Sequence, residues 1–274
     1  MQVERSAFYK PEEILNQVEQ RIKKVRNVGE SIDYLTFVSD GEPTLDINLG
    51  VEIELLRQFG IKIAVITNAS LIWLQDVRQD LAKADWVSLK IDSTCEEIWR
   101  KINRPHTGLR LSSILDSILE FAEVYNGELV TETMLVKNLN DDDEHVKEVV
   151  DFLARLKPAK AYLAIPTRPP SEGLVEPPDE NAINRAYQIF TERISGVEYL
   201  IGYEGNSFAF TGNVEQDLLD ITAVHPMREE AVKKLLLKAK VDWSAIDTLI
   251  AEEKLAETEY MQKKFIMRKF SDRS

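Results

Sequence analysis

The chain has 274 residues, of which 44% are hydrophobic and 30% are charged, which is typical of a soluble globular protein of one or two domains. Its one cysteine, Cys95, excludes a disulfide framework and a cysteine-rich metal site formed within the chain. The net charge of −13 disfavours general binding to nucleic acid, and neither a membrane-spanning apolar run nor a signal peptide is recognisable. We therefore predict a cytoplasmic protein without a membrane partner.

Strand-like and helix-like segments alternate along the first two thirds of the chain. A helix is predicted to begin at Pro11 and to continue past Ile22, because apolar residues recur there at helical spacing. Six short apolar runs predict strands at 34–38, 62–66, 86–91, 129–136, 161–165 and 197–201. Further helices are predicted at 51–59, 74–83, 96–102, 111–122, 142–156 and 179–192. Such a series indicates βαβ units with parallel strands.

Two architectures fit this series, an open doubly wound sheet and a (β/α) barrel. No Gly-x-Gly-x-x-Gly follows a strand, which disfavours a dinucleotide-binding sheet. We predict an α/β fold in which residues 1–212 form a partial parallel (β/α) barrel.

Residues 213–274 break the alternation and predict a second domain. Helices are expected at 218–221, 229–237 and 243–252, followed by strands at 255–260 and 264–270. Three helices and a hairpin are typical of a winged helix-turn-helix. Its third helix, however, carries Asp247 and Glu252 and no basic residue, which disfavours contact with phosphates. We expect this module to contact a protein or to cover the barrel mouth.

Polar residues follow the predicted strands, at the edge of the sheet where parallel α/β folds bind ligands. They are Asp40-Gly41-Glu42, Thr67-Asn68, Asp92-Ser93, Asn138 and Arg168. Each one taken singly is also explained as a helix cap or turn residue. Five such strand ends together favour a ligand site.

These residues also resemble a known family. Tyr34-Leu35-Thr36-Phe37-Val38-Ser39-Asp40-Gly41-Glu42-Pro43-Thr44-Leu45 is similar to the second strand of radical S-adenosylmethionine (radical SAM) enzymes, which ends in Gly-Gly-Glu or Gly-x-Gly-Glu-Pro. Thr67-Asn68-Ala69-Ser70-Leu71 and Ser88-Leu89-Lys90-Ile91-Asp92 resemble the segments of the next two strands. Ile102-Asn103-Arg104-Pro105 and Arg168-Pro169-Pro170 are similar to a subset of the family that carries a C-terminal winged helix.

The resemblance implies cofactors and residue roles. Members use a 4Fe–4S cluster, held by Cys-x-x-x-Cys-x-x-Cys, to cleave S-adenosylmethionine to a 5′-deoxyadenosyl radical that modifies a substrate. By resemblance, Glu42 contacts the methionine amino group, with Gly41 and Pro43 beside it. Thr67, Asn68 and Asp92 lie near the ribose or the substrate, and Asn138 lies near the methionine carboxylate. Asn103, Arg104 and Arg168 are candidate substrate contacts, the substrate is unknown, and no catalytic residue is assigned.

The chain departs from the family in its cysteines. Cluster ligation needs three thiolates, and the chain has only Cys95. The resemblance therefore places the first strand and the cluster loop upstream of residue 1, so we expect no metal site and no reductive cleavage by this chain alone. A barrel without its first strand also exposes a sheet edge.

Two other functions are compatible with the sequence. A non-catalytic nucleoside-binding or regulatory protein would use the barrel as a sensor and the winged helix as an interaction module. A cluster-free barrel enzyme would use acid/base or Schiff-base chemistry at Lys90 or Lys137. Cys95 is expected to be a packed residue, and His106, His145 and His225 show no metal-ligand spacing and are expected to be structural or on the surface.

Overall fold

The computed structural model describes residues 3–38, 41–167, 169, 175–200, 208, 210–224, 226–260 and 262–269. The chain divides into two compact units. Unit 1 comprises Met1–Val18, Asp33–Thr167 and Leu174–Gly202, and unit 2 comprises Glu19–Ile32, Arg168–Gly173 and Tyr203–Ser274. Helix α1 (Pro11–Asn27) passes from one unit into the other. The domain boundary at residue 212 stays a prediction.

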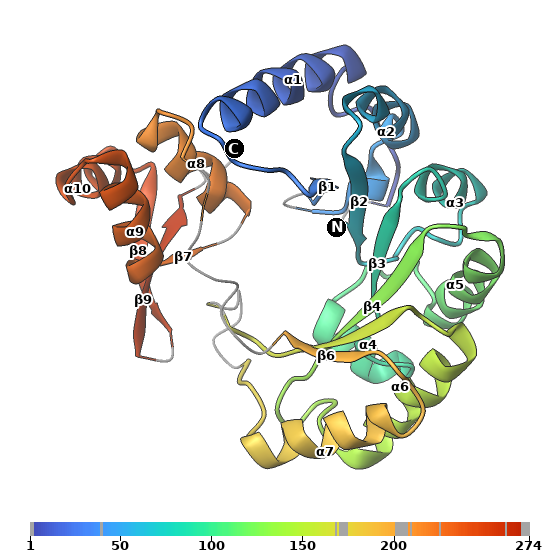
Figure 1. Cartoon of the computed structure of the whole chain (residues 1–274). Helices are drawn as coiled ribbons and strands as arrows, with labels where there is room; N and C mark the ends of the chain where they lie inside the picture. Colours follow the sequence, from blue (N-terminus) through green and yellow to red (C-terminus); the bar gives the residue numbers. More distant parts are fainter. Residues whose placement is uncertain are drawn as a thin grey trace. The chain divides into compact units, whose positions relative to one another are not determined.

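Unit 1 is built on a parallel sheet whose strands follow one another in chain order (Figure 1). The strands are β1 (Tyr34–Phe37), β2 (Lys62–Thr67), β3 (Trp86–Lys90), β4 (Glu128–Met134), β5 (Lys160–Ala164) and β6 (Val197–Leu200). Every crossover therefore steps in the same direction. Because such crossovers are right-handed, they place their helices on one face of the sheet. This order selects the barrel-like arrangement over the doubly wound sheet, whose strand order reverses.

Five helices of unit 1 cover the outer face of this curved sheet (Figure 1). They are α2 (Leu49–Leu56), α3 (Gln75–Leu81), α5 (Leu111–Val124), α6 (Asp143–Leu156) and α7 (Glu180–Thr191). Helix α4 (Glu96–Asn103), which follows β3, lies instead at the carboxyl ends of the strands. The apolar sides of the covering helices pack on alternate strand residues such as Val65, Leu89 and Leu163, all fully buried in one core. The opposite side chains of the strands include Lys90 and Glu132, which are register partners on β3 and β4. One sheet face is thus apolar and the other carries charge.

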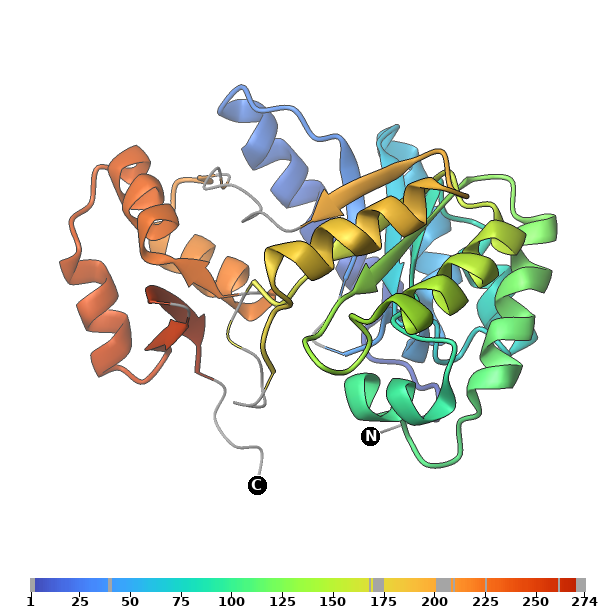
Figure 2. The same ribbon diagram turned by 90° about the horizontal axis from the view of Figure 1, so that it is seen from below.

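Unit 2 contains α8 (Val214–Val224), α9 (Glu229–Ala239) and α10 (Ser244–Ala251) beside a small antiparallel sheet (Figure 2). The sheet consists of β7 (Met227–Arg228), β8 (Leu255–Tyr260) and β9 (Lys263–Arg268) in the order β7-β9-β8. Leu218, Leu235 and Ile246 are buried in its core. The three predicted helices and the hairpin are confirmed, whereas β7 is missed because two residues are too short to show a periodic pattern.

The predicted strands and helices of unit 1 are also confirmed, with differences of a few residues at their ends. The helix predicted at 51–59 is α2 followed by a 3₁₀ turn (Arg57–Phe59), which Gly60 ends in the left-handed conformation at φ 65°. No helix in the described part of the chain is both long and apolar enough to cross a membrane.

Candidate functional site

Unit 1 holds a pocket of about 500 Å³ beside the carboxyl ends of β1, β2 and β3. Its apolar wall includes Leu45, Trp99, Ile102 and Leu109. Six polar residues line it: Glu42, Asn68, Ser70, Lys90, Asn103 and His106. An apolar wall with a few converging polar groups is the usual composition of a small-molecule site.

Glu42 is the most tightly held polar group of this pocket. It precedes the 3₁₀ turn Pro43–Leu45, and its Oε1 accepts hydrogen bonds from the backbone N–H and the hydroxyl of Thr44, at 3.1 and 2.8 Å. The hydroxyl of Thr67, at the end of β2, donates to the same oxygen at 2.5 Å. The backbone N–H of Asn68 donates to Oε2 at 2.8 Å. Two strand-end loops therefore fix one carboxylate, and Oε2 keeps acceptor capacity for a ligand.

Burial also sets the charge state of this carboxyl. Glu42 is 7% exposed, and this burial raises its pKa, although the donors from Thr67, Asn68 and Thr44 partly offset the effect. A cationic group bound at Oε2 would stabilise the ionised form.

A second polar network lies at the end of β3 and is centred on Asp92, which is 1% exposed. Its Oδ1 accepts from the backbone N–H of Met134 at 2.8 Å and lies 3.2 Å from Nζ of Lys90. Its Oδ2 accepts from Nδ2 of Asn103 at 2.7 Å. Asp92 thus does not line the pocket itself but orients two residues that do.

Lys90 is held as a cation. Burial lowers its pKa, but the carboxylates of Asp92 and Glu132 outweigh this effect and the net pKa is raised. A Schiff base needs the neutral amine as nucleophile. The structure therefore disfavours Lys90 as a Schiff-base lysine, and Lys137 pairs with Glu176 at 2.9 Å on the surface.

Two asparagines near the end of β4 take different positions. Asn138, the predicted contact, is exposed at φ 61°, and its N–H donates to Asp141. Asn140 is 2% exposed, and its Nδ2 donates to the carbonyl oxygens of Asp92 and Met134, at 2.8 and 2.9 Å. The structure thus connects Asn140, not Asn138, to the Asp92 network. The strand-end pattern overlooks Asn140 because it lies several residues beyond the strand, where sequence shows only a polar loop.

Of the other residues predicted for the site, only some line the pocket. Gly41 lines the pocket, whereas Pro43 belongs to the 3₁₀ turn behind Glu42 and does not. Arg104 ends α4 in the left-handed conformation at φ 44° and is not a lining residue. Arg168 lies outside the described residues, as does His225. The site assignments made from sequence stay predictions.

Metal-ligand clusters are not found in the part of the chain that the structure describes, where no group of three His, Cys, Asp or Glu residues comes together. Cys95 is the N-cap residue of α4 and is partly exposed. His145 contacts Asp142 at the start of α6 at 2.5 Å. His106 is partly exposed and lines the strand-end pocket.

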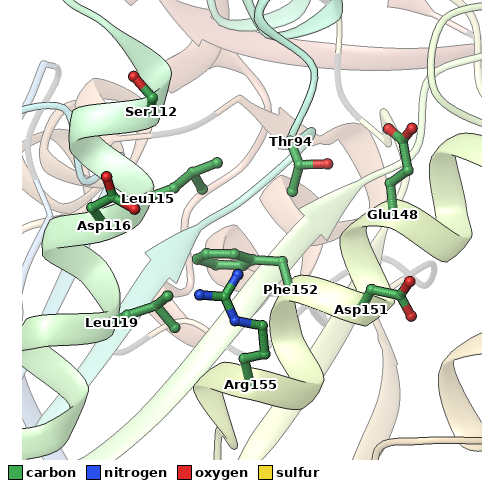
Figure 3. Close-up of a pocket in the computed structure, with 9 residues that line it drawn as sticks. All are labelled: Thr94, Ser112, Leu115, Asp116, Leu119, Glu148, Asp151, Phe152 and Arg155. Atoms are coloured by element: carbon green, nitrogen blue, oxygen red, sulfur yellow. The ribbon is translucent and has the colours of Figure 1, made fainter.

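A second pocket of about 400 Å³ lies between the helices α5 and α6 (Figure 3). Leu115, Leu119 and Phe152 form its apolar surface, and Arg155 lies across it (Figure 3). None of the residues predicted for the ligand site lines this pocket. The pocket at the strand ends is therefore the candidate functional site.

A one-directional parallel sheet with a polar pocket at its carboxyl edge defines the structural class, and comparison with known proteins defines the family. A sequence profile of the Radical SAM superfamily matches residues 2–153, which is more than half of the chain. A UPF0026 protein of Methanocaldococcus jannaschii is 49% identical over 273 residues, 99% of this chain and 84% of that protein. UPF0026 proteins of Synechocystis and Helicobacter pylori are 35% and 32% identical over 139 and 149 residues, covering 52% and 48% of their lengths.

Solved structures show the same fold. A radical SAM methyltransferase from Sphaerobacter thermophilus superposes with a TM-score of 0.58 at 18% identity, over 79% of this chain and 60% of that one. SuiB of Streptococcus suis, solved with S-adenosylmethionine bound, gives 0.52 at 17% identity, over 69% and 43%. The chain belongs to the UPF0026 family of the radical SAM superfamily, in which a partial parallel barrel is the shared fold.

Proposed function

We propose that this chain binds S-adenosylmethionine in the strand-end pocket. We further propose that the parent activity is the reductive cleavage of this molecule to a 5′-deoxyadenosyl radical, which modifies a substrate. Superfamily membership supports the cofactor. The observation that supports this binding site most directly is Glu42, a buried carboxylate that four donor groups hold at the pocket wall.

Glu42 suits the amino group of the methionine moiety. Oε1 already accepts three hydrogen bonds, whereas Oε2 accepts one, from the N–H of Asn68. An ammonium group that donates to Oε2 fills the remaining acceptor position and balances the buried charge. Gly41 leaves this wall open, because nothing lies within 4 Å of the position a Cβ would take there. Thr44 and Thr67 hold the carboxylate through their hydrogen bonds to Oε1, and Pro43 begins the 3₁₀ turn that follows Glu42.

The polar residues that follow β3 suit the rest of the ligand. We propose that Asn68 and Lys90 lie along the ribose, with Asp92 holding Lys90 in place. Asn138 is proposed near the methionine carboxylate on the family resemblance alone, since it is exposed and does not line the pocket. Asn103, Arg104 and Arg168 are proposed as contacts of the unidentified substrate.

The residues present do not fit a 4Fe–4S cluster. Such a cluster takes several cysteine thiolates, and the 274 residues contain one cysteine. Cys95 caps α4, and no other candidate ligands gather around it within the described ranges. We therefore propose nucleoside binding, and no reductive cleavage, for this chain alone.

Calorimetry with S-adenosylhomocysteine, which has the same amino and ribose groups and no sulfonium, tests the binding site. Glu42→Gln is expected to weaken binding at least ten-fold, about 1.4 kcal/mol, because it removes the charge that pairs with the ammonium. Glu97→Gln, on the exposed face of α4, is the matched control and is expected to bind like the parent chain. Equal affinity of the parent chain and Glu42→Gln would refute the assignment.

The cysteine count also favours a second candidate, a non-catalytic nucleoside-binding or regulatory protein. Both candidates require the same pocket. They separate by turnover: reductive cleavage of S-adenosylmethionine in a cysteine-complete version supports the first candidate, and binding without turnover supports the second. Anaerobic reconstitution of this chain with iron and sulfide tests the absence of a cluster, which both candidates assume. We expect this chain to acquire no stoichiometric absorbance near 400 nm, roughly where thiolate-ligated clusters absorb. Such absorbance would show that the chain does hold a cluster.

For unit 2 we propose a winged helix-turn-helix that contacts a protein. The element order α8-β7-α9-α10-β8-β9 supports this assignment. Helix α10 contains Asp247 and no basic residue, which disfavours nucleic acid as the partner. Anisotropy with fluorescent duplex DNA and single-stranded RNA at low salt is expected to show no binding, and saturable binding would refute this view.

A further inference from the structure

His106 lies in the connection between α4 and α5 and lines the strand-end pocket. Its Nδ1 is 3.1 Å from the backbone nitrogen of Gly108, which carries a hydrogen and donates it. Nδ1 therefore acts as an acceptor, and in the neutral ring the proton is on Nε2. The backbone thus selects the tautomer in which His106 offers an N–H donor.

Asn103, at the end of α4, also lines the pocket and offers the opposite group. Its Nδ2 donates to Oδ2 of Asp92 at 2.7 Å. A carboxylate oxygen accepts only, so this contact fixes which end of the side chain is the amide nitrogen. Oδ1 of Asn103 is then buried without a hydrogen-bond partner among the described residues. Leaving a buried acceptor unpaired costs about 1–3 kcal/mol, so a ligand donor there is favourable.

We propose that His106 and Asn103 recognise an amide group of the substrate. Nε2–H of His106 donates to the amide oxygen, and Oδ1 of Asn103 accepts the amide N–H. This assignment rests on the proposed function, since it places the substrate in the same pocket, on the side formed by α4 and the segment that follows it.

Charged groups fit this pair less well. A carboxylate has no hydrogen to donate, so it leaves Oδ1 of Asn103 unpaired. An ammonium has no acceptor for His106. Neither His106 nor Asn103 brings a fixed charge, and the charge of Lys90 is already engaged by Asp92 and Glu132. The apolar side chains of Trp99 and Pro105, which also line the pocket, suit a neutral planar group.

The test uses small amides and the imidazole NMR signals of the full chain, which contains three histidines. His106→Phe identifies the signals of His106, and His145→Gln is the control on α6. N-methylacetamide is expected to shift the Nε2 signal of His106 in a saturable manner. N,N-dimethylacetamide and methyl acetate, which lack the N–H, are expected to bind at least ten-fold more weakly. Asn103→Leu is expected to remove this selectivity while His106 still responds.

The outcomes separate the two proposals. No response of His106, or equal responses to N-methylacetamide and N,N-dimethylacetamide, overturns the amide assignment. S-adenosylhomocysteine is titrated into the same samples. Binding of this nucleoside without amide selectivity overturns only the inference about His106 and Asn103, whereas amide selectivity without nucleoside binding overturns only the proposed cofactor site.

Discussion

Glu52 on α2 is a buried carboxyl whose ionisation makes unit 1 sensitive to pH. The residue is 4% exposed, and its Oε1 has no hydrogen-bond partner within the described part of the chain. Burial, followed by the nearby carboxylate of Asp46, raises the pKa of Glu52 from 4.5 to about 7. We predict that Glu52→Gln, which is neutral at every pH, removes this sensitivity.

The sign and size of this pH dependence follow from the different proton binding of Glu52 in the folded and unfolded states. Between pH 4.5 and about 7 the folded protein keeps a proton on Glu52 that the unfolded chain has lost, so stability falls as pH rises. The two pKa values differ by about 2.5, which corresponds to about 3.4 kcal/mol at 1.36 kcal/mol per pKa unit. About 2.5 kcal/mol of this is lost between pH 5 and pH 8. Above pH 8 no further loss from this group is expected.

Urea denaturation of both proteins at pH 5 and pH 8 measures the effect. The unfolding free energy of Glu52→Gln minus that of the parent is expected to be about 2.5 kcal/mol larger at pH 8 than at pH 5, because the parent alone loses stability over this range. Glu54→Gln is the control, since Glu54 is on the same helix but exposed and paired with Lys83 at 2.9 Å. If the unfolding free energies of the variant and the parent differ by the same amount at pH 5 and pH 8, the reasoning is refuted. That result would show that Glu52 has the same pKa in the folded and unfolded states.

Three further substitutions test other parts of the molecule. Thr67→Val removes the hydroxyl that donates to Glu42 and is expected to weaken S-adenosylhomocysteine binding about ten-fold; unchanged affinity in calorimetry would contradict this. Asp217→Asn removes the buried charge that pairs with Arg21 at 2.9 Å and is expected to destabilise unit 2 by about 2 kcal/mol, seen as faster hydrogen exchange in α8; unchanged exchange would contradict it. Leu237→Gln, at a position 80% exposed, is expected to change the unfolding free energy by less than about 0.5 kcal/mol in denaturation, and a larger loss would show that Leu237 is buried in solution.

The fold was predictable because its signals are local. Strands such as β2 and β3 are continuous apolar runs, and helices such as α6 begin at a capping residue, here Asp142, whose side chain accepts from two backbone N–H groups. The strand order was less accessible, because an open doubly wound sheet and a barrel use the same alternation of elements. The order of β1 to β6 in the structure selects between them.

The site was predictable only in part, because sequence places polar residues at strand ends without showing their partners. Glu42 and Asn68 are joined by a hydrogen bond across two loops, in agreement with their predicted proximity. Asn140 and His106 were not recognised, since each reaches the site from a loop whose course depends on packing. Loop conformation is a tertiary property, so periodicity carries no signal for it.

Glu42 also shows why capping and ligand binding are not exclusive explanations of a strand-end residue. Its Oε1 caps the 3₁₀ turn through the N–H of Thr44, which is the structural role expected of such a residue. Its Oε2 is free of that role and accepts from Asn68 on the neighbouring loop. The cap fixes the carboxylate before any ligand arrives, so a ligand that donates to Oε2 meets an acceptor already oriented by the fold. A cap of this kind would lower the entropy cost of binding, so the structural role of Glu42 is compatible with the proposed one.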